Sequence, residues 1–230
     1  MCPFPDATAT VYPSALGIVR HSRIVPHTGY TQVMHPTALL IVDVQNDFCP
    51  SGALAVPEGD QVIAPLNRAA AWMAQRGGLV VASRDWHPRT TRHFKAFGGL
   101  WPAHCVQETH GAAFHPDLKL PDGAVIVSKG TSTEDDGYSA FEGHTNDGRT
   151  LHEVLQAHGV RRLVVGGLAT DYCVRASVLD ALQHGYEVVV LTDAIRGVNL
   201  QPDDSARALQ EMQAHGAHLM PTEEALRDDN

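Results

Sequence analysis

The chain has 230 residues, 43% of them hydrophobic, which suits one globular domain of ordinary size. It carries 17 lysine and arginine residues against 26 aspartate and glutamate residues, so the formal net charge is -9. Because no basic cluster offsets this charge, we exclude a surface that binds nucleic acid or anionic membranes. The longest apolar runs have the length of a strand and fall far short of the roughly 20 residues that a membrane helix needs.

The amino terminus and the cysteines bear on the compartment. No basic segment precedes an apolar one at the start of the chain, so no secretory signal is visible. The four cysteines, Cys2, Cys49, Cys105 and Cys173, form no Cys-x-x-Cys pair and do not suggest a secreted disulfide scaffold. We therefore expect reduced thiols in a cytoplasmic protein.

Residues 1–33 differ from the rest, since they mix proline, threonine, serine and histidine without periodicity. One interpretation is a weakly structured leader. The other is that translation begins at Met34, directly before the first clear strand. Neither interpretation gives residues 1–33 a catalytic role, and we expect the folded domain to span residues 34–230.

From residue 34 onward, short apolar runs alternate with helical patterns. The expected strands cover residues 37–42, 79–83, 124–128, 161–165 and 187–191. The expected helices cover residues 60–75, 150–157, 171–183 and 205–214, and a short last segment lies around residues 217–220. This alternation predicts a three-layer α/β/α fold with a mainly parallel central sheet, whose strands are buried on both faces. Phosphate-binding glycine motifs are absent from the sequence, so nothing indicates nucleotide binding.

Reactive residues follow several of the expected strands. In open parallel sheets, chemistry gathers at the carboxyl ends of the strands. Asp43 closes the first strand, residues 84–87 (R-D-W-H) follow the second, Lys129 follows the third and the turn 166–173 follows the fourth. An acid, a pair of metal-ligating residues, a lysine and a cysteine are therefore expected at one edge of the sheet.

Three of these residues predict nucleophilic catalysis. Cys173 lies where a strand turns into a helix, and the free amides there lower a thiol pKa and can hold an oxyanion. Lys129 would favour the thiolate, and Asp43 would pair with Lys129 and relay protons between the thiol, a leaving amine and water. Taken singly, a buried structural cysteine and a solvated lysine remain alternatives. Together the three residues predict a cysteine-nucleophile amide hydrolase.

The segment 84–105 has the composition of a metal site. In an extended segment Asp85 and His87 point to the same side, and the loop residues His93 and His104 can fold back to the same point. One carboxylate with two or three imidazoles suits one divalent ion, zinc foremost, with iron and manganese as alternatives. The competing interpretation is a set of histidines on a surface loop.

Six stretches carry a resemblance to a known family. They are L-L-I-V-D-V-Q-N-D-F at 39–48, R-D-W-H-P at 84–88, W-P-A-H-C-V at 101–106, S-K-G at 128–130, G-Y-S-A-F-E-G at 137–143 and G-L-A-T-D-Y-C-V at 167–174. In this order they resemble the nicotinamidase branch of the isochorismatase-like cysteine hydrolases. The resemblance covers residues 35–200 and leaves the leader 1–33 without a counterpart.

The resemblance implies that nicotinamide and water give nicotinate and ammonia through a thioester on Cys173, as part of NAD salvage, with pyrazinamide also accepted. It implies a catalytic triad of Asp43, Lys129 and Cys173, and an oxyanion hole formed by the backbone N–H groups of Ala169 and Cys173. A cis peptide bond between Leu168 and Ala169 is expected on the same ground.

The resemblance also implies a metal site and a substrate pocket. Asp85, His87 and His104 would bind the metal, with His93 as a fourth ligand as in some members. In the family the metal faces the ring nitrogen of the substrate. Aromatic pocket walls are expected from Phe48, Trp101 and Tyr138, for which packing in the core is the alternative.

Other functions remain open at this point. The main alternative is a related hydrolase that acts on another small amide, such as a carbamoyl or ureido compound. A non-catalytic metal-binding protein and a metallohydrolase in which Cys173 is a bystander are further alternatives. The expected partner is a small-molecule substrate, and the sequence leaves a homo-oligomer open.

Overall fold

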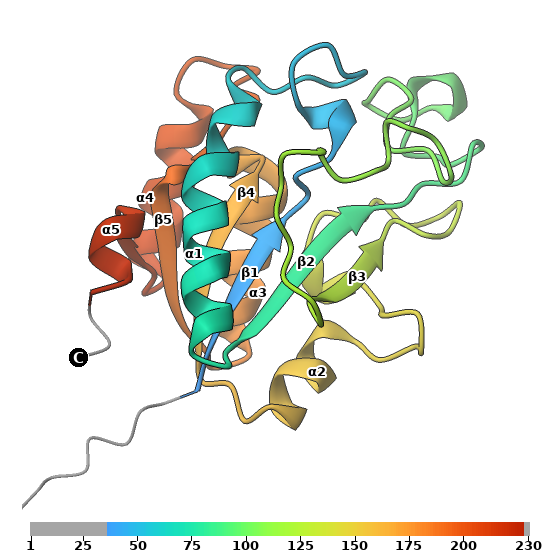
Figure 1. The fold of residues 1–230 in the computed structure, drawn as a ribbon. Coiled ribbons are helices and arrows are strands. Elements are labelled where there is room, and N and C mark those ends of the chain that lie inside the picture. The colour runs from blue at the N-terminus through green and yellow to red at the C-terminus, as the bar shows by residue number, and fades with distance from the viewer. Residues whose placement is uncertain (1–35, 228–230) are drawn as a thin grey trace, which may run out of the picture. The chain divides into compact units, whose positions relative to one another are not determined.

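The computed structural model describes residues 36–227 (Figure 1), and the predicted leader 1–33 lies outside the described residues. Six strands form one sheet in the order β3-β2-β1-β4-β5-β6, and every neighbouring pair is parallel. The strands are β1 (Thr37–Val42), β2 (Leu79–Asp85), β3 (Val125–Lys129), β4 (Arg162–Leu168), β5 (Glu187–Arg196) and β6 (His218–Met220).

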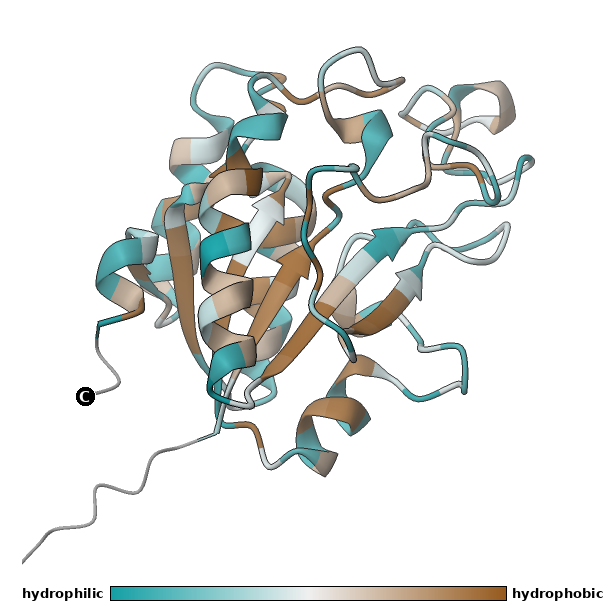
Figure 2. Ribbon diagram, viewed as in Figure 1, coloured by the Kyte–Doolittle hydropathy of each residue, from teal (hydrophilic) through white to brown (hydrophobic). Residues whose placement is uncertain are grey.

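Helices cover both faces of this sheet (Figure 1). The helices α1 (Ile63–Gln75) and α5 (Thr222–Ala225) pack on one face, and α2 (Leu151–Ala157), α3 (Arg175–Gln183) and α4 (Asp204–Ala214) pack on the other. Because side chains alternate along a strand, Leu39 of β1 joins the core under α1, whereas Leu40 joins the core under α3. Figure 2 shows β1 hydrophobic over most of its length, as expected for a strand that is buried on both faces. The predicted three-layer α/β/α class is confirmed.

Two strands run further than the apolar runs indicate. β4 continues to Leu168 and β5 to Arg196, and their pairing shifts register between Val165 and Gly167. Gly167 has a φ of 130°, and a Cβ there would lie 2.1 Å from the carbonyl oxygen of Val42. Only glycine fits so close to β1, and this approach carries β4 on to the turn that holds Cys173.

Helix starts also differ from the sequence patterns. A 3₁₀ turn at Gly59–Val62 precedes α1, and a π-type turn at Thr170–Val174 precedes α3, so Cys173 lies in a wide turn rather than in a regular first helical turn. The helix α2 begins after Thr150, whose side chain and that of Glu153 form a capping box. Among the helices of residues 36–227, none has the length and apolar character to cross a membrane.

Candidate active site

The carboxyl edge of the sheet brings Asp43, Lys129 and Cys173 together. The Nζ atom of Lys129 lies 2.7 Å from Oδ2 of Asp43 and 3.4 Å from Sγ of Cys173, and it donates to the carbonyl oxygen of Gly137 at 2.6 Å. All three side chains are buried. Ser83, within β2, donates to Oδ1 of Asp43 at 2.8 Å. Asp43 is therefore held at both oxygens, once by an ammonium and once by a hydroxyl.

Burial and charge pull in opposite directions at this cluster. Burial raises the pKa of Asp43 to about 6, although the charge of Lys129 opposes this rise. Burial acts to lower the pKa of Lys129, but the charges of Asp43 and Asp85 outweigh it and hold that pKa well above its ordinary value. At neutral pH the site thus contains a charged ammonium beside a carboxylate that can take up a proton near neutrality.

The thiol differs from the sequence-based expectation. Burial raises the pKa of Cys173 well above its ordinary value, and the carboxylates of Asp43 and Asp85 add to this rise, whereas Lys129 lowers it. A lowered thiol pKa was expected from the turn amides and the lysine, so this prediction is wrong for the site as it stands. The physical reason is first the burial of the thiol, to which the charges of two nearby acids add. The thiol therefore needs a base to take its proton, and Asp43 is in place for that role.

Asp85 connects this cluster to three histidines. Its Oδ1 atom accepts a hydrogen bond from Lys129, and its Oδ2 atom lies 3.7 Å from Nε2 of His87 and 3.9 Å from Nε2 of His104. The buried side chain of Gln45 fixes the backbone of Asp85, because its Oε1 accepts from the Asp85 N–H at 2.8 Å and its Nε2 donates to the Asp85 carbonyl at 2.8 Å. One carboxylate thus faces the lysine on one side and the imidazoles on the other.

The three buried rings of His87, His93 and His104 have ligand atoms within 4.8 Å of one another. Each ring uses Nδ1 for an outer contact, so Nε2 of each is left as the ligand atom. The Nδ1 contacts are the carbonyl of Gly130 for His87 at 3.1 Å, Oδ1 of Asp136 for His93 at 3.3 Å and the carbonyl of Pro102 for His104 at 2.8 Å.

A divalent cation fits this donor set. The Nε2 atom of His87 is buried and has no hydrogen-bond partner, a costly state that a metal ion would relieve. Burial lowers the pKa of His104 to about 4 and also lowers that of His93, so both rings are neutral as metal ligands must be. With the carboxylate of Asp85, three imidazoles make a nitrogen and oxygen set of the kind that zinc binds.

A second group of possible ligands, from Asp43, Asp85 and Cys173, has the same compactness. Here the ammonium of Lys129 contacts all three side chains. The lysine already balances the charge of the two carboxylates, which leaves no role for a cation at this point.

One pocket is lined by Cys173 of the triad, by two of the three histidines and by the three predicted aromatic residues. Asp43, Lys129 and His87 are not part of that lining. Trp101 donates its indole N–H to the hydroxyl of Tyr138 at 3.0 Å, which ties two of the walls together. The Leu168–Ala169 peptide bond is cis, as the resemblance predicts, and Ala169 and Cys173 lie on the same pocket lining. The pocket is lined by Phe48, Leu54, Asp85, His93, Trp101, His104, Asp136, Gly137, Tyr138, Ala169, Tyr172, Cys173 and Val198.

Several of these residues were not found by the sequence patterns. Asp136 holds His93 and lies in the acidic stretch S-T-E-D-D just before the matched segment 137–143. Tyr172 directly precedes the nucleophile, and its ring packs edge-on against Trp101 with centroids 4.9 Å apart. The position of Tyr172 beside Cys173 was the available signal. Val198 and Leu54 lie in loops whose sequences give no signal that these residues line the pocket.

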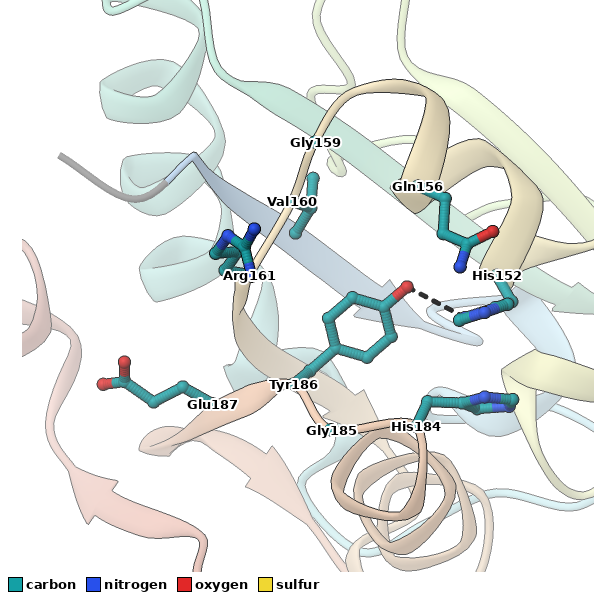
Figure 3. Close-up of a pocket in the computed structure, with 9 residues that line it drawn as sticks. All are labelled: His152, Gln156, Gly159, Val160, Arg161, His184, Gly185, Tyr186 and Glu187. Atoms are coloured by element: carbon teal, nitrogen blue, oxygen red, sulfur yellow. Dashed lines mark hydrogen bonds between the residues drawn. The ribbon is translucent and has the colours of Figure 1, made fainter. Parts of the chain in front are cut away.

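Another open pocket lies at the opposite end of β4 and β5, by their amino ends (Figure 3). Its lining includes Tyr186, whose hydroxyl is hydrogen-bonded to Nδ1 of His152 at 2.9 Å. The lining holds no cysteine, no lysine and none of the predicted site residues. The chemistry is therefore assigned to the carboxyl edge.

Residues 37–224 match the isochorismatase domain. The chain belongs to the isochorismatase family. Within this family it is 48% identical over 202 residues to nicotinamidase of Escherichia coli (strain K12), covering 81% of this chain and 95% of that protein. It is 40% identical over 189 residues to nicotinamidase/pyrazinamidase of Mycobacterium tuberculosis, covering 80% of this chain and 97% of that protein. The crystal structure of pyrazinamidase of Pyrococcus horikoshii in complex with zinc superposes with a TM-score of 0.75 at 47% identity, covering 81% of this chain and 99% of that one.

Proposed function

We propose that this chain hydrolyses nicotinamide to nicotinate and ammonia, in NAD salvage, through a thioester on Cys173. The observation that carries the proposal is the position of Lys129, whose Nζ contacts the acid Asp43 and the thiol of Cys173. That thiol lines the same pocket as the imidazoles of His93 and His104. The activities named for the E. coli and M. tuberculosis relatives support the same reaction.

The first half of the reaction forms the thioester. Asp43 takes the proton of Cys173, and the thiolate attacks the carboxamide carbon, so that a C–S bond forms and the carbonyl oxygen becomes an oxyanion. We assign that oxyanion to the backbone N–H groups of Ala169 and Cys173. When the C–N bond breaks, Asp43 returns the proton to the nitrogen and ammonia leaves.

The second half releases the acid. Asp43 takes a proton from water as the water oxygen attacks the thioester carbon, and the C–S bond then breaks. The sulfur regains the proton from Asp43, and the product leaves as nicotinic acid, which loses its carboxyl proton to water and becomes nicotinate. Lys129 stays charged throughout. Its positive charge offsets the repulsion between the two buried carboxylates and the negative charge that develops on sulfur.

Asp85, His87 and His104, with His93 as the fourth ligand, would hold one divalent ion, and we propose zinc. Such an ion supplies an electron-pair acceptor for the ring nitrogen of the substrate. The chain's own contribution is orientation, since Phe48, Trp101 and Tyr138 line the pocket together with His93, His104 and Cys173. A ring with a second nitrogen has the same shape, so we propose that pyrazinamide is also accepted.

We also propose a cytoplasmic location, which the free thiols of Cys49, Cys105 and Cys173 support. The folded domain is proposed to span residues 34–230. The proposed partner is a small-molecule substrate, and a homo-oligomer stays open.

Release of ammonia and nicotinate from nicotinamide by the purified wild type and by Cys173→Ala tests the proposal. Wild-type turnover that Cys173→Ala abolishes is the expected result, with Cys49→Ala as the matched control for loss of a buried thiol. Equal rates for wild type and Cys173→Ala would end the cysteine-hydrolase hypothesis. Trapping of an acyl group on Cys173 separates it from a metallohydrolase.

Metal removal separates nicotinamide from the carbamoyl or ureido alternative. Chelation and His87→Ala are expected to abolish activity on nicotinamide, because the ring-orienting group is lost. Nicotinamide turnover that survives both treatments would refute the ring-orienting role and would favour an amide that carries no ring nitrogen.

A further inference from the structure

A short segment after β5 forms one wall of the active-site pocket. We call residues 197–199 the strap. Its central residue, Val198, lines the pocket together with Cys173. The strap is held by Asp171, since Oδ1 of Asp171 accepts from the N–H of Val198 at 2.9 Å and Oδ2 accepts from the N–H of Asn199 at 2.7 Å. The two oxygens of one carboxylate thus accept hydrogen bonds from two consecutive backbone amides.

The far end of the strap is fixed as well. Oδ1 of Asn199 accepts from the N–H of Ser205, at the start of α4, at 2.9 Å, and Asn199 itself has a φ of 51°. At Gly197 a Cβ would lie 1.8 Å from Oγ of Ser205, so a larger residue at this position would have to displace that side chain. The strap is therefore fitted between the turn that carries the nucleophile and the start of α4.

Asp171 and Cys173 belong to the same π-type turn, Thr170–Val174. Asp171, which holds the strap, and the nucleophile Cys173 therefore lie on one continuous turn of the backbone. A strap that moved outward would widen the space in front of the sulfur, whereas the Asp171 clamp fixes the distance between wall and sulfur.

We propose that Asp171 is a positioning residue that holds Val198 against the substrate ring and so sets the size of molecule that reaches Cys173. The identity of that ring as nicotinamide rests on the proposed function. The clamp itself rests only on the two hydrogen bonds and the pocket lining. The two claims can therefore fail separately.

Thiol modification tests the clamp without any substrate. The rates at which iodoacetamide and the bulkier N-phenylmaleimide modify Cys173 are measured by peptide mass spectrometry on wild type, Asp171→Asn and Asp193→Asn. In Asp171→Asn an amide N–H₂ faces a backbone N–H, so one clamp bond is lost and the strap loosens. We expect the rate ratio of the bulky to the small reagent to rise at least about tenfold, the low end for the loss of one hydrogen bond to a charged group.

Asp193→Asn is the matched control. The carboxylate of Asp193 also accepts from a backbone amide, that of Thr222 at 2.7 Å, but Asp193 lines no part of this pocket. Its reagent ratio is expected to match that of wild type. An unchanged ratio in Asp171→Asn, or an equal rise in Asp193→Asn, would overturn the clamp. Should Asp171→Asn not fold, Val198→Ala replaces it. The smaller side chain shortens the wall, so the same reagent ratio must rise. No rise in that ratio would overturn the proposal.

Steady-state kinetics with nicotinamide test the effect of the clamp on the substrate. For Asp171→Asn we expect the KM for nicotinamide to rise about tenfold while kcat changes less than about threefold, because the wall positions the ring and does not take part in bond making. A fall in kcat with unchanged KM would assign Asp171 to the nucleophile instead and overturn the proposal. If wild type does not hydrolyse nicotinamide, the proposed function fails, and the reagent ratio alone decides the clamp.

Discussion

The Nζ atom of Lys129 lies 3.4 Å from the Sγ atom of Cys173, and both side chains are buried at the carboxyl edge of the sheet. The same ammonium contacts the carboxylates of Asp43 and Asp85. Lys129 therefore has two roles that substitution can separate. It supports the nucleophile, and it neutralises two buried acids that would otherwise repel each other.

Lys129→Met is expected to abolish activity and to lower the free energy of unfolding by about 3–5 kcal/mol, because two buried carboxylates lose their counter-charge. Cys173→Ala is expected to abolish activity but to cost only about 1 kcal/mol, since it removes one small side-chain atom. Urea unfolding followed by circular dichroism, together with ammonia release, measures both. Lys119→Met, at an exposed lysine, is the control. Equal stability of Lys129→Met and wild type would contradict the buried ion-pair network.

The pH dependence follows from Asp43, whose pKa burial raises to about 6. Below that pH Asp43 holds a proton and cannot take the one on Cys173, so kcat/KM is expected to fall as the pH falls through about 6. Ser83→Ala removes a hydrogen bond that favours the ionised carboxylate, so the pKa of Asp43 rises and the acid limb moves to higher pH, by on the order of half a unit. A pH–rate profile from pH 4.5 to 8 measures both. A Ser83→Ala limb at lower pH than that of wild type would contradict the assignment.

The sequence predicted the convergence of Asp43, Lys129 and Cys173 for a physical reason. Parallel strands all end at one edge, so residues that close β1 and β3 and follow β4 must meet whatever the intervening loops do. The three-layer fold was predictable on the same basis, because strands with apolar side chains on both faces need cover on both faces.

The loops and the electrostatics were not predictable in this way. Asp136 reaches His93 and Val198 reaches the pocket only through loop conformations that no periodicity encodes. β5 continues through the polar residues Thr192 and Asp193, although the sequence pattern predicts that the strand ends before them. The pKa of Cys173 rises because two acids and burial outweigh one lysine, a balance that requires the distances.

Asp136 leads to a prediction about metal affinity. The Nδ1–H of His93 donates to Oδ1 of Asp136 at 3.3 Å, an outer contact that orients the ring. Asp136→Asn is expected to weaken zinc binding about tenfold, at the low end for loss of such a contact, in competition with a chromophoric chelator. The neighbouring exposed Asp135→Asn is the matched control and should bind zinc as wild type does. Equal zinc affinities in the two variants would show that His93 does not depend on Asp136.

Gln45 leads to a prediction about stability and metal binding together. Its buried amide bridges the N–H and the carbonyl of Asp85 and also donates to the carbonyl of Ala112 at 2.9 Å. Gln45→Leu leaves these buried backbone groups unpaired, so the free energy of unfolding is expected to fall by about 2–4 kcal/mol, from roughly 1–3 kcal/mol per unsatisfied group with partial relaxation. Zinc affinity should fall with it, because the backbone that carries the Asp85 carboxylate loses its support. Gln61→Leu, at an exposed glutamine, should change neither quantity, and a Gln45→Leu variant as stable as Gln61→Leu would mean that Asp85 is held by Lys129 alone.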